Sequence, residues 1–376
     1  MINLLMIGDY QGRNRRGGPG QIFTLITDEL TKVTYSLKEL RIYILNSKLP
    51  PELYEVRSGR MLKLPGYKLL SSIMYVIASS RSIYVSGNSI IASLCVLLSK
   101  IIGKTVCHHV HGLEIIEYKY EEKFLFRSLP YIANEILLLS TANLLLFPSR
   151  IYKEITYTIY PWIKAKSHVI PNGLSSEDLN LLATCSKTVK SSNYTGDCVL
   201  YVGRPTKIKG FHILVHLARI MLKRYPKLHI LAVVEDSSKA RSILLKNYRD
   251  MEIIKRMIFF ERVDKRTLYA LYKGALLTLI PSLFESFNMV ALESILAGTP
   301  IVITNNCGIV DFLHLLTCRK CFYIAKNLKS LLQGFEFYYL SKFKCPSICV
   351  EILLKIFGAG KISLNLLYIL INCNHK

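Results

Sequence analysis

Two glutamates in the second half of the chain stand in stretches that are otherwise strongly apolar. Glu293 follows Glu285 by eight positions, or about two helical turns. An unpartnered carboxylate is costly in such surroundings, so each should have a polar partner. The vicinal hydroxyls of a sugar would serve, because one carboxylate can accept hydrogen bonds from two of them. The structural alternative is that Glu285 caps a helix and that Glu293 pairs with a lysine or arginine.

A basic turn with the sequence GRPTKIKG follows an expected strand over residues 199–202 and opens a helix. The turn begins at Gly203 and carries the cations Arg204 and Lys209. Two fixed cations can neutralise a diphosphate, particularly one that gains charge as it departs. A solvated basic turn is the alternative, because lysines and arginines are common in loops.

A second glycine-rich loop, RNRRGGPG, precedes an expected helix over residues 21–32. Gly17 and Gly18 would let the backbone approach a ligand, and the start of a helix attracts phosphate. The loop matches neither GxGxxG nor GxxxxGK[ST], so taken alone it is also compatible with a flexible turn.

His111 ends an expected strand in the sequence HHVHGLE. An imidazole at this point can hydrogen-bond a reacting group or satisfy a backbone carbonyl. His109 shares the same strand face, but no matched acidic cluster accompanies the pair, so we expect no metal there.

Four cysteines near the end of the chain have the internal spacings of zinc ligands: Cys318, Cys321, Cys345 and Cys349. Scattered packing cysteines are the simpler interpretation. The chain has 10 cysteines and its first residues do not resemble a signal peptide, which favours reduced thiols and a cytoplasmic location.

The elements that must position these residues alternate between short β-like runs and longer helical segments, which indicates parallel α/β layers. In the first half we expect strands at residues 4–7, 42–45, 83–85, 105–110, 144–147 and 169–170, with helices at 21–32 and 121–140. In the second half we expect strands at 199–202, 229–234, 257–260, 277–280, 301–303 and 322–324, with helices at 211–225, 265–274 and 286–297. Ligands of such sheets bind at the carboxyl ends of the strands.

A polar, strand-poor segment separates the two halves. We therefore expect an N-terminal domain over residues 1–182, a linker over 183–196, a C-terminal domain over 197–350 and a helical tail over 351–376 that crosses back to the first domain. A length of 376 residues suits two domains of about 150–200 residues each.

Composition excludes some classes of protein and leaves others. With 51% hydrophobic and 20% charged residues, wholesale disorder is excluded. The 49 lysines and arginines exceed the 26 acidic residues in both halves, and the net charge of +23 attracts nucleotide phosphates, nucleic acid or acidic lipid headgroups. No stretch reaches the roughly 18 uninterrupted apolar residues of a membrane-spanning helix.

In their order and spacing, the motifs resemble the retaining GT4-type glycosyltransferases of group 1. The resemblance covers about residues 1–325 and is strongest over 168–312. It rests on GGPG (17–20), HVHGLE (109–114), ANLLLFPS (142–149), VIPNG (169–173), GRPTKIKG (203–210), GALLTLIPS (274–282), FESFNMVALESILAGTP (284–300) and CGIVD (307–311).

The resemblance implies a GT-B fold, in which two Rossmann-like parallel-sheet domains face each other across a cleft. By the same resemblance, Arg204 and Lys209 would bind the donor pyrophosphate beside Gly203, with Gly17 and Gly18 closing over it from the first domain.

The resemblance also implies how the rest of the donor is held. Glu293 would bind the ribose hydroxyls, and His111 would lie near the reacting edge of the sugar. The transferred sugar would be held by Glu285, Ser286, Phe287 and Asn288.

Four positions depart from the family pattern. Ser175 replaces an acid, Leu276 an aspartate, and Asn288 and Glu261 each replace a glycine. These departures bear on which donor binds.

The function implied is transfer of a sugar, with retention and without a metal cofactor, from a UDP- or GDP-sugar to a lipid-linked, polysaccharide or protein-glycan acceptor. The alternatives are a basic polyanion-binding protein and a nucleotide-sugar epimerase on the same scaffold. No DNA- or RNA-binding motif stands out, so we expect no nucleic acid partner.

Residues 118–127 mix aromatic and basic side chains and precede an apolar helix over 129–140. Such a segment could lie peripherally on an anionic membrane; an amphipathic core helix is the alternative.

Overall fold

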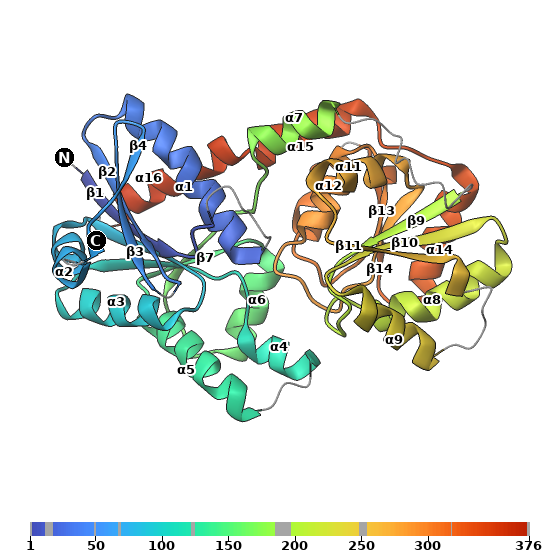
Figure 1. The fold of residues 1–376 in the computed structure, drawn as a ribbon, viewed down its shortest axis with the longest axis horizontal. Helices are drawn as coiled ribbons and strands as arrows, with labels where there is room; N and C mark the ends of the chain where they lie inside the picture. The colour runs from blue at the N-terminus through green and yellow to red at the C-terminus, as the bar shows by residue number, and fades with distance from the viewer. Residues whose placement is uncertain are drawn as a thin grey trace. The chain divides into compact units, whose positions relative to one another are not determined.

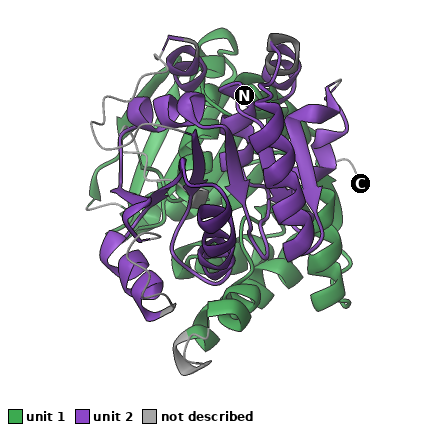
Figure 2. Ribbon diagram, turned by 90° about the vertical axis from the view of Figure 1, so that its right-hand side faces the viewer, with its two compact units in different colours: residues 1–175, 357–376 green, residues 176–356 purple. Residues whose placement is uncertain are grey.

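The computed structural model describes residues 2–11, 18–48, 50–66, 69–121, 125–184, 197–247, 254–316 and 318–373. They form two compact units, and each is considered by itself below. Unit 1 comprises residues 1–175 and 357–376, and unit 2 comprises residues 176–356 (Figures 1 and 2).

Unit 1 is built on an eight-stranded sheet in the order β4-β3-β2-β1-β5-β6-β7-β8. Its strands are β1 (Ile2–Gly8), β2 (Leu40–Asn46), β3 (Glu52–Arg57), β4 (Arg60–Lys63), β5 (Ser82–Ser86), β6 (Thr105–His109), β7 (Leu144–Phe147) and β8 (Lys166–Val169). The pairs β2–β3 and β3–β4 are antiparallel, and the other neighbours are parallel. The central strands are continuous apolar runs because helices cover both faces of a parallel sheet.

The helices of unit 1 are α1 (Gly18–Ser36), α2 (Leu69–Ser79), α3 (Ile90–Ile101), α4 (Glu114–Glu121), α5 (Leu125–Thr141), α6 (Arg150–Ile159) and α16 (Ala359–Asn372). Although α16 is the last helix of the chain, it packs against α1 and β5. The Ser82 hydroxyl donates a hydrogen bond of 2.8 Å to the Leu370 carbonyl. The C-terminal helix is thus part of the first unit.

Unit 2 holds a six-stranded parallel sheet in the order β11-β10-β9-β12-β13-β14. Its strands are β9 (Asp197–Val202), β10 (Leu228–Val234), β11 (Met257–Glu261), β12 (Leu277–Ile280), β13 (Ile301–Thr304) and β14 (Phe322–Ala325). Its helices include α7 (Ser176–Thr184), α8 (Phe211–Arg224), α9 (Ser237–Asn247), α11 (Lys265–Gly274), α12 (Met289–Leu296), α13 (Val310–Leu313), α14 (Leu328–Ser341) and α15 (Ser347–Phe357).

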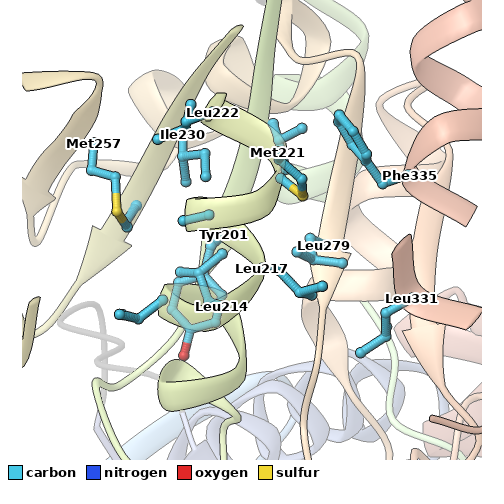
Figure 3. Close-up of a cluster of buried hydrophobic side chains, with 14 of the residues drawn as sticks. Tyr201, Leu214, Leu217, Met221, Leu222, Ile230, Met257, Leu279, Leu331 and Phe335 are labelled. Carbon is cyan, nitrogen blue, oxygen red and sulfur yellow. The ribbon is translucent and has the colours of Figure 1, made fainter. Parts of the chain in front are cut away.

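The core of unit 2 lies where α8 and α14 pack on the sheet. Figure 3 shows Leu214, Leu217 and Met221 of α8 beside side chains of the strands and of α14, and all belong to one buried cluster. Burial of this apolar stripe orients α8, which begins at Phe211 directly after the turn 203–210 that follows β9.

Three expected boundaries differ from the structure. Residues 176–184 form α7, which belongs to unit 2 because it packs on α11 and because Lys265 pairs with Asp178. Of the expected linker 183–196, residues 183 and 184 end α7 and the rest lie outside the described residues. The helix expected over 121–140 corresponds to α5, which begins at Leu125, and residue 121 is the last residue of α4.

Candidate functional site

The strand order of unit 2 changes direction between β9 and β12, which are neighbours in the sheet. Both strands are parallel, so the loops that follow them leave from the same edge. These loops are 203–210, the basic turn, and 281–288, which contains Glu285. In open α/β sheets such a switch point is where ligands bind.

The two loops are in direct contact. Leu283 N donates a hydrogen bond of 2.8 Å to the Ile208 carbonyl. Gly210 has a φ of 68°, and a Cβ there would lie 1.8 Å from the Pro281 carbonyl oxygen. Only glycine fits at this point. The close approach fixes the basic turn against the end of β12.

The basic turn is also held by hydrogen bonds from a buried tyrosine of β9. The Tyr201 hydroxyl lies 3.0 Å from the Arg204 carbonyl oxygen and 3.3 Å from the Lys209 carbonyl oxygen. The backbone that carries both expected phosphate-binding cations is therefore anchored at two points. The Arg204 side chain is exposed, whereas Lys209 is partly buried.

Lys209 and Glu285 meet at this edge. Lys209 Nζ lies 2.6 Å from Glu285 Oε1, and the Ser282 hydroxyl donates to the same oxygen at 3.2 Å. Only 13% of the Glu285 side chain is exposed, so the carboxylate is stabilised by a cation and a hydroxyl as the sequence argument required. Glu285 does not cap a helix.

The backbone around Glu285 is clamped by the loop after β13. Glu285 N donates to the Asn306 carbonyl at 3.2 Å, and Gly308 N donates to the Glu285 carbonyl at 3.0 Å. Ile309 N donates to the Phe287 carbonyl at 2.7 Å, while the buried Phe287 ring packs 5.8 Å from that of Phe312. The CGIVD motif thus supports the FESFN loop, and the partly buried Ser286 lies between its clamped residues.

Asn288 is the N-cap of α12, which begins at Met289, three residues later than the expected start of this helix at 286. Its φ is 96°, and its side chain accepts a hydrogen bond of 2.8 Å from Ala291 N. Asparagine tolerates positive φ better than most residues and is a strong N-cap. This explains how Asn288 can stand where the resembled family has glycine.

Glu293, on α12, has a different set of neighbours. Tyr272 donates a hydrogen bond of 3.1 Å to Glu293 Oε2, so its direct partner is a tyrosine and not the lysine or arginine of the structural alternative. Burial raises the pKa of Glu293 to about 7; the Tyr272 hydrogen bond and the charge of Lys265 act against this, and Asp178 acts with it.

His111 and the glycines of the first loop belong to unit 1, separately from the residues above. His111 lies two residues past the end of β6 and is buried. Its ring is 4.0 Å from that of His109, whose Nδ1 lies 2.8 Å from the Tyr84 hydroxyl. Burial lowers the pKa of His111 to about 3, so its imidazole is neutral at physiological pH. Gly18 is the first residue of α1, and Gly17 lies outside the described residues.

Within the described parts of the chain, no three His, Cys, Asp or Glu residues are grouped so as to hold a metal ion. Cys321 and Cys345 are buried and Cys318 is partly exposed; Cys345 Sγ lies 3.9 Å from the Cys321 carbonyl oxygen. The side chain of Cys349 is outside the described residues.

A comparison with known protein families concerns the part of the chain that forms the unit 2 sheet. Residues 187–330 match the family model for glycosyl transferases group 1. The group 1 segment includes the basic turn, both glutamates and all six strands of unit 2.

Curated relatives match this chain over part of their length. An uncharacterized glycosyltransferase of Methanocaldococcus jannaschii is 28% identical over 170 residues, which are 44% of this chain and 43% of the relative. A D-inositol 3-phosphate glycosyltransferase of Corynebacterium efficiens is 31% identical over 108 residues, or 28% and 26% of the two chains. The chain thus spans less than half the length of these relatives.

Solved structures match over the whole chain and establish the fold as GT-B. Sucrose-phosphate synthase from Thermosynechococcus elongatus superposes with a TM-score of 0.65 at 15% identity, covering 98% of each chain. Anabaena HepE, solved in complex with UDP and glucose, superposes with a TM-score of 0.64 at 17% identity, covering 99% of this chain and 100% of that one. The expected α/β fold of two Rossmann-like domains is confirmed.

Sequence reasoning did not name the partners that hold the candidate residues. Tyr201, Tyr272 and Ser282 are ordinary residues of strands, helices and loops, and their roles arise only when the sheet places them. A weak signal existed for Ser282, which follows β12 directly and precedes Glu285 by three residues.

Proposed function

We propose that this protein is a group 1 glycosyltransferase, of the retaining GT4 type, that takes a sugar from a nucleotide-sugar donor. The observation that carries the proposal is the pairing of Lys209 with Glu285 at the switch point of the unit 2 sheet. A cation and a carboxylate side by side suit a ligand that has a diphosphate next to a polyhydroxylated ring.

In this proposal Lys209 and Arg204 bind the diphosphate, and Glu285 accepts hydrogen bonds from the hydroxyls of the sugar. Breaking the anomeric carbon–oxygen bond leaves an oxocarbenium-like sugar and a more negative diphosphate. Fixed cations favour that separation more than they favour the ground state. They supply charge that a metal ion would otherwise provide, which is why we propose a metal-independent reaction.

Retention would follow if the acceptor hydroxyl attacks the face from which the diphosphate leaves, with the leaving phosphate taking its proton. The resemblance assigns His111 to the reacting edge of the sugar. A neutral imidazole, which the lowered pKa of His111 provides, can accept or donate a hydrogen bond to a sugar hydroxyl.

The names of relatives guide the choice of substrates. Structures of HepE contain UDP or UDP-glucose, so UDP-sugars are the first donors to test, followed by GDP-sugars. Relatives are named D-inositol 3-phosphate glycosyltransferase and mannosylfructose-phosphate synthase. We therefore propose that phosphorylated sugars and polyols be tested as acceptors alongside lipid-linked, polysaccharide and protein-glycan acceptors.

The deciding experiment is titration of UDP-glucose, GDP-mannose and ADP-glucose into the wild-type protein and two lysine variants. Lys209→Ala should weaken donor binding at least about tenfold, because it removes a charge-assisted contact. Lys207→Ala is the matched control, since Lys207 is an exposed cation of the same turn, and it should change affinity less than about threefold, as expected of an exposed charge. Equal effects of both variants would indicate general attraction of anions, as in a polyanion-binding protein. No donor binding by the wild type would contradict the proposal.

A further inference from the structure

Helix α3 of unit 1 is apolar on two opposite faces. Its inner face packs into the core beneath it through residues that include Ala92, Cys95 and Val96. Its outer face carries Ile90, Leu94, Leu97 and Ile101, which are 69%, 57%, 39% and 79% exposed. A surface helix ordinarily presents charged or polar residues on that side. In α3 the only charged residue is Lys100.

The neighbouring helix α2 also exposes apolar side chains on its surface. Leu70, Met74 and Tyr75 are exposed on it, and α2 contains no charged residue. The two helices pack against each other and lie side by side in Figure 1. The seven side chains form what we call the α2–α3 apolar face: Leu70, Met74, Tyr75, Ile90, Leu94, Leu97 and Ile101. Exposed apolar groups gathered in this way mark an interaction surface.

The charge of the surrounding sequence indicates what this face contacts. Between Glu55 and Glu114 the chain has no acidic residue but has seven basic ones. These are Arg57, Arg60, Lys63, Lys68, Arg81, Lys100 and Lys104. A second copy of the chain would bring the same positive charge against this region and be repelled. A partner that is apolar inside and negatively charged at its surface would complement both the α2–α3 apolar face and the basic residues of this part of the sequence.

We propose that the α2–α3 apolar face docks on a membrane that contains anionic lipid. The exposed aliphatic and aromatic side chains would enter the headgroup layer, and the exposed Lys100 of α3 would attract lipid phosphates. The described residues include no helix that is long and apolar enough to cross a membrane, so the contact is one of docking. The inference uses only unit 1 and is independent of the proposed donor site.

This surface differs from the segment that the sequence indicated. Residues 122–124 lie outside the described residues, as do the side chains of 125–127. The expected helix 129–140 falls within α5, which contacts α3 and exposes Leu129 and Tyr131. The larger exposed apolar surface, however, lies on α2 and α3.

The test is co-sedimentation of the full chain with vesicles of phosphatidylcholine alone or mixed equally with phosphatidylglycerol. The wild type should bind the mixed vesicles and bind the neutral ones at least about tenfold more weakly. Ile90→Gln with Leu94→Gln should reduce binding to mixed vesicles at least about tenfold, since two half-exposed aliphatic side chains are lost.

The matched control is Leu364→Gln with Tyr368→Gln on α16. These residues are also four positions apart, are 53% and 69% exposed, and belong to the same unit. The control should bind like the wild type, and thermal unfolding should show that both variants remain folded. Failure of the wild type to bind mixed vesicles, or equal binding by both double variants, would overturn the proposal.

Sedimentation velocity provides a separate check on the occupant. A monomeric wild type supports docking on lipid. A dimer that Ile90→Gln with Leu94→Gln dissociates would show that a second copy covers the face, and would overturn the proposal. The donor titration does not depend on the vesicle or sedimentation experiments. A failure of membrane docking can therefore be distinguished from a failure of the proposed transferase activity.

Discussion

At the scale of single residues, the candidate site consists of buried charges that each have a specific partner. Glu285 is neutralised by Lys209, whereas the direct partner of Glu293 among the described residues is the Tyr272 hydroxyl. The consequence is a difference in titration: burial raises the pKa of Glu293 to about 7. A carboxyl with such a pKa changes its charge in the physiological range.

Glu293 should therefore make stability depend on pH. A raised carboxyl pKa means that the folded state binds the proton more tightly than the unfolded chain, so the contribution is present below about pH 4.5 and is lost as pH rises through about 7. Glu293→Gln removes this titrating group. The unfolding free energy of the variant minus that of the wild type should therefore increase between pH 5 and pH 8, by at most about 3 kcal/mol. Urea denaturation at both pH values measures it. The same difference between variant and wild type at both values would contradict the assignment.

At the scale of elements, the site depends on the contact between the loop after β9 and the loop after β12. Gly210 is the point of closest approach, with a positive φ and no room for a Cβ beside Pro281. Gly210→Ala should lower the unfolding free energy by about 2–4 kcal/mol through strain and displaced backbone, and should also weaken donor binding.

Gly66→Ala provides the control for this prediction. Gly66 has no atom within 4 Å of a Cβ built on it and its φ is not positive, so the substitution should be neutral. Circular dichroism during urea denaturation measures both variants. Equal midpoints for Gly210→Ala and the wild type would show that the two loops are not held as the structure indicates.

The sequence predicted those elements whose apolar pattern is local. The strands 144–147 and 277–280 and the helix 265–274 agree with β7, β12 and α11, because each is a distinct apolar or amphipathic run. The hairpin of β3 and β4 was not predicted, since these short edge strands are largely polar and turn through Ser58 and Gly59.

The candidate site was predictable only in part for a related reason. Its residues lie at strand ends that the sequence marks, and the structure brings Lys209 and Glu285 together across 76 positions. That Lys209 meets Glu285 depends on the order of strands in the sheet, which places β9 beside β12 and which no local pattern records. The start of α12 at Met289 likewise depends on the positive φ of Asn288.

At the scale of the whole molecule, the chain leaves unit 1, builds unit 2 and returns to unit 1 with its last helix. Leu366 and Leu370 of α16 are fully buried, so a segment distant in sequence completes the core of the first unit. The single tryptophan of the chain, Trp162, also lies in unit 1, where its ring is 5.4 Å from that of Tyr160. Its fluorescence therefore reports on unit 1.

Leu370→Ala should lower the stability of unit 1 by about 2–5 kcal/mol, because it removes buried methyl groups and leaves a cavity. Leu364→Ala, on the same helix but 53% exposed, should change it by less than about 0.5 kcal/mol. Urea denaturation followed by Trp162 fluorescence separates the two variants. If the two variants shift the unfolding transition equally, or if neither variant shifts it, α16 does not stabilise unit 1 through its buried face. A shift for Leu370→Ala alone would show that the last helix of the chain is needed to complete unit 1, in which the chain begins.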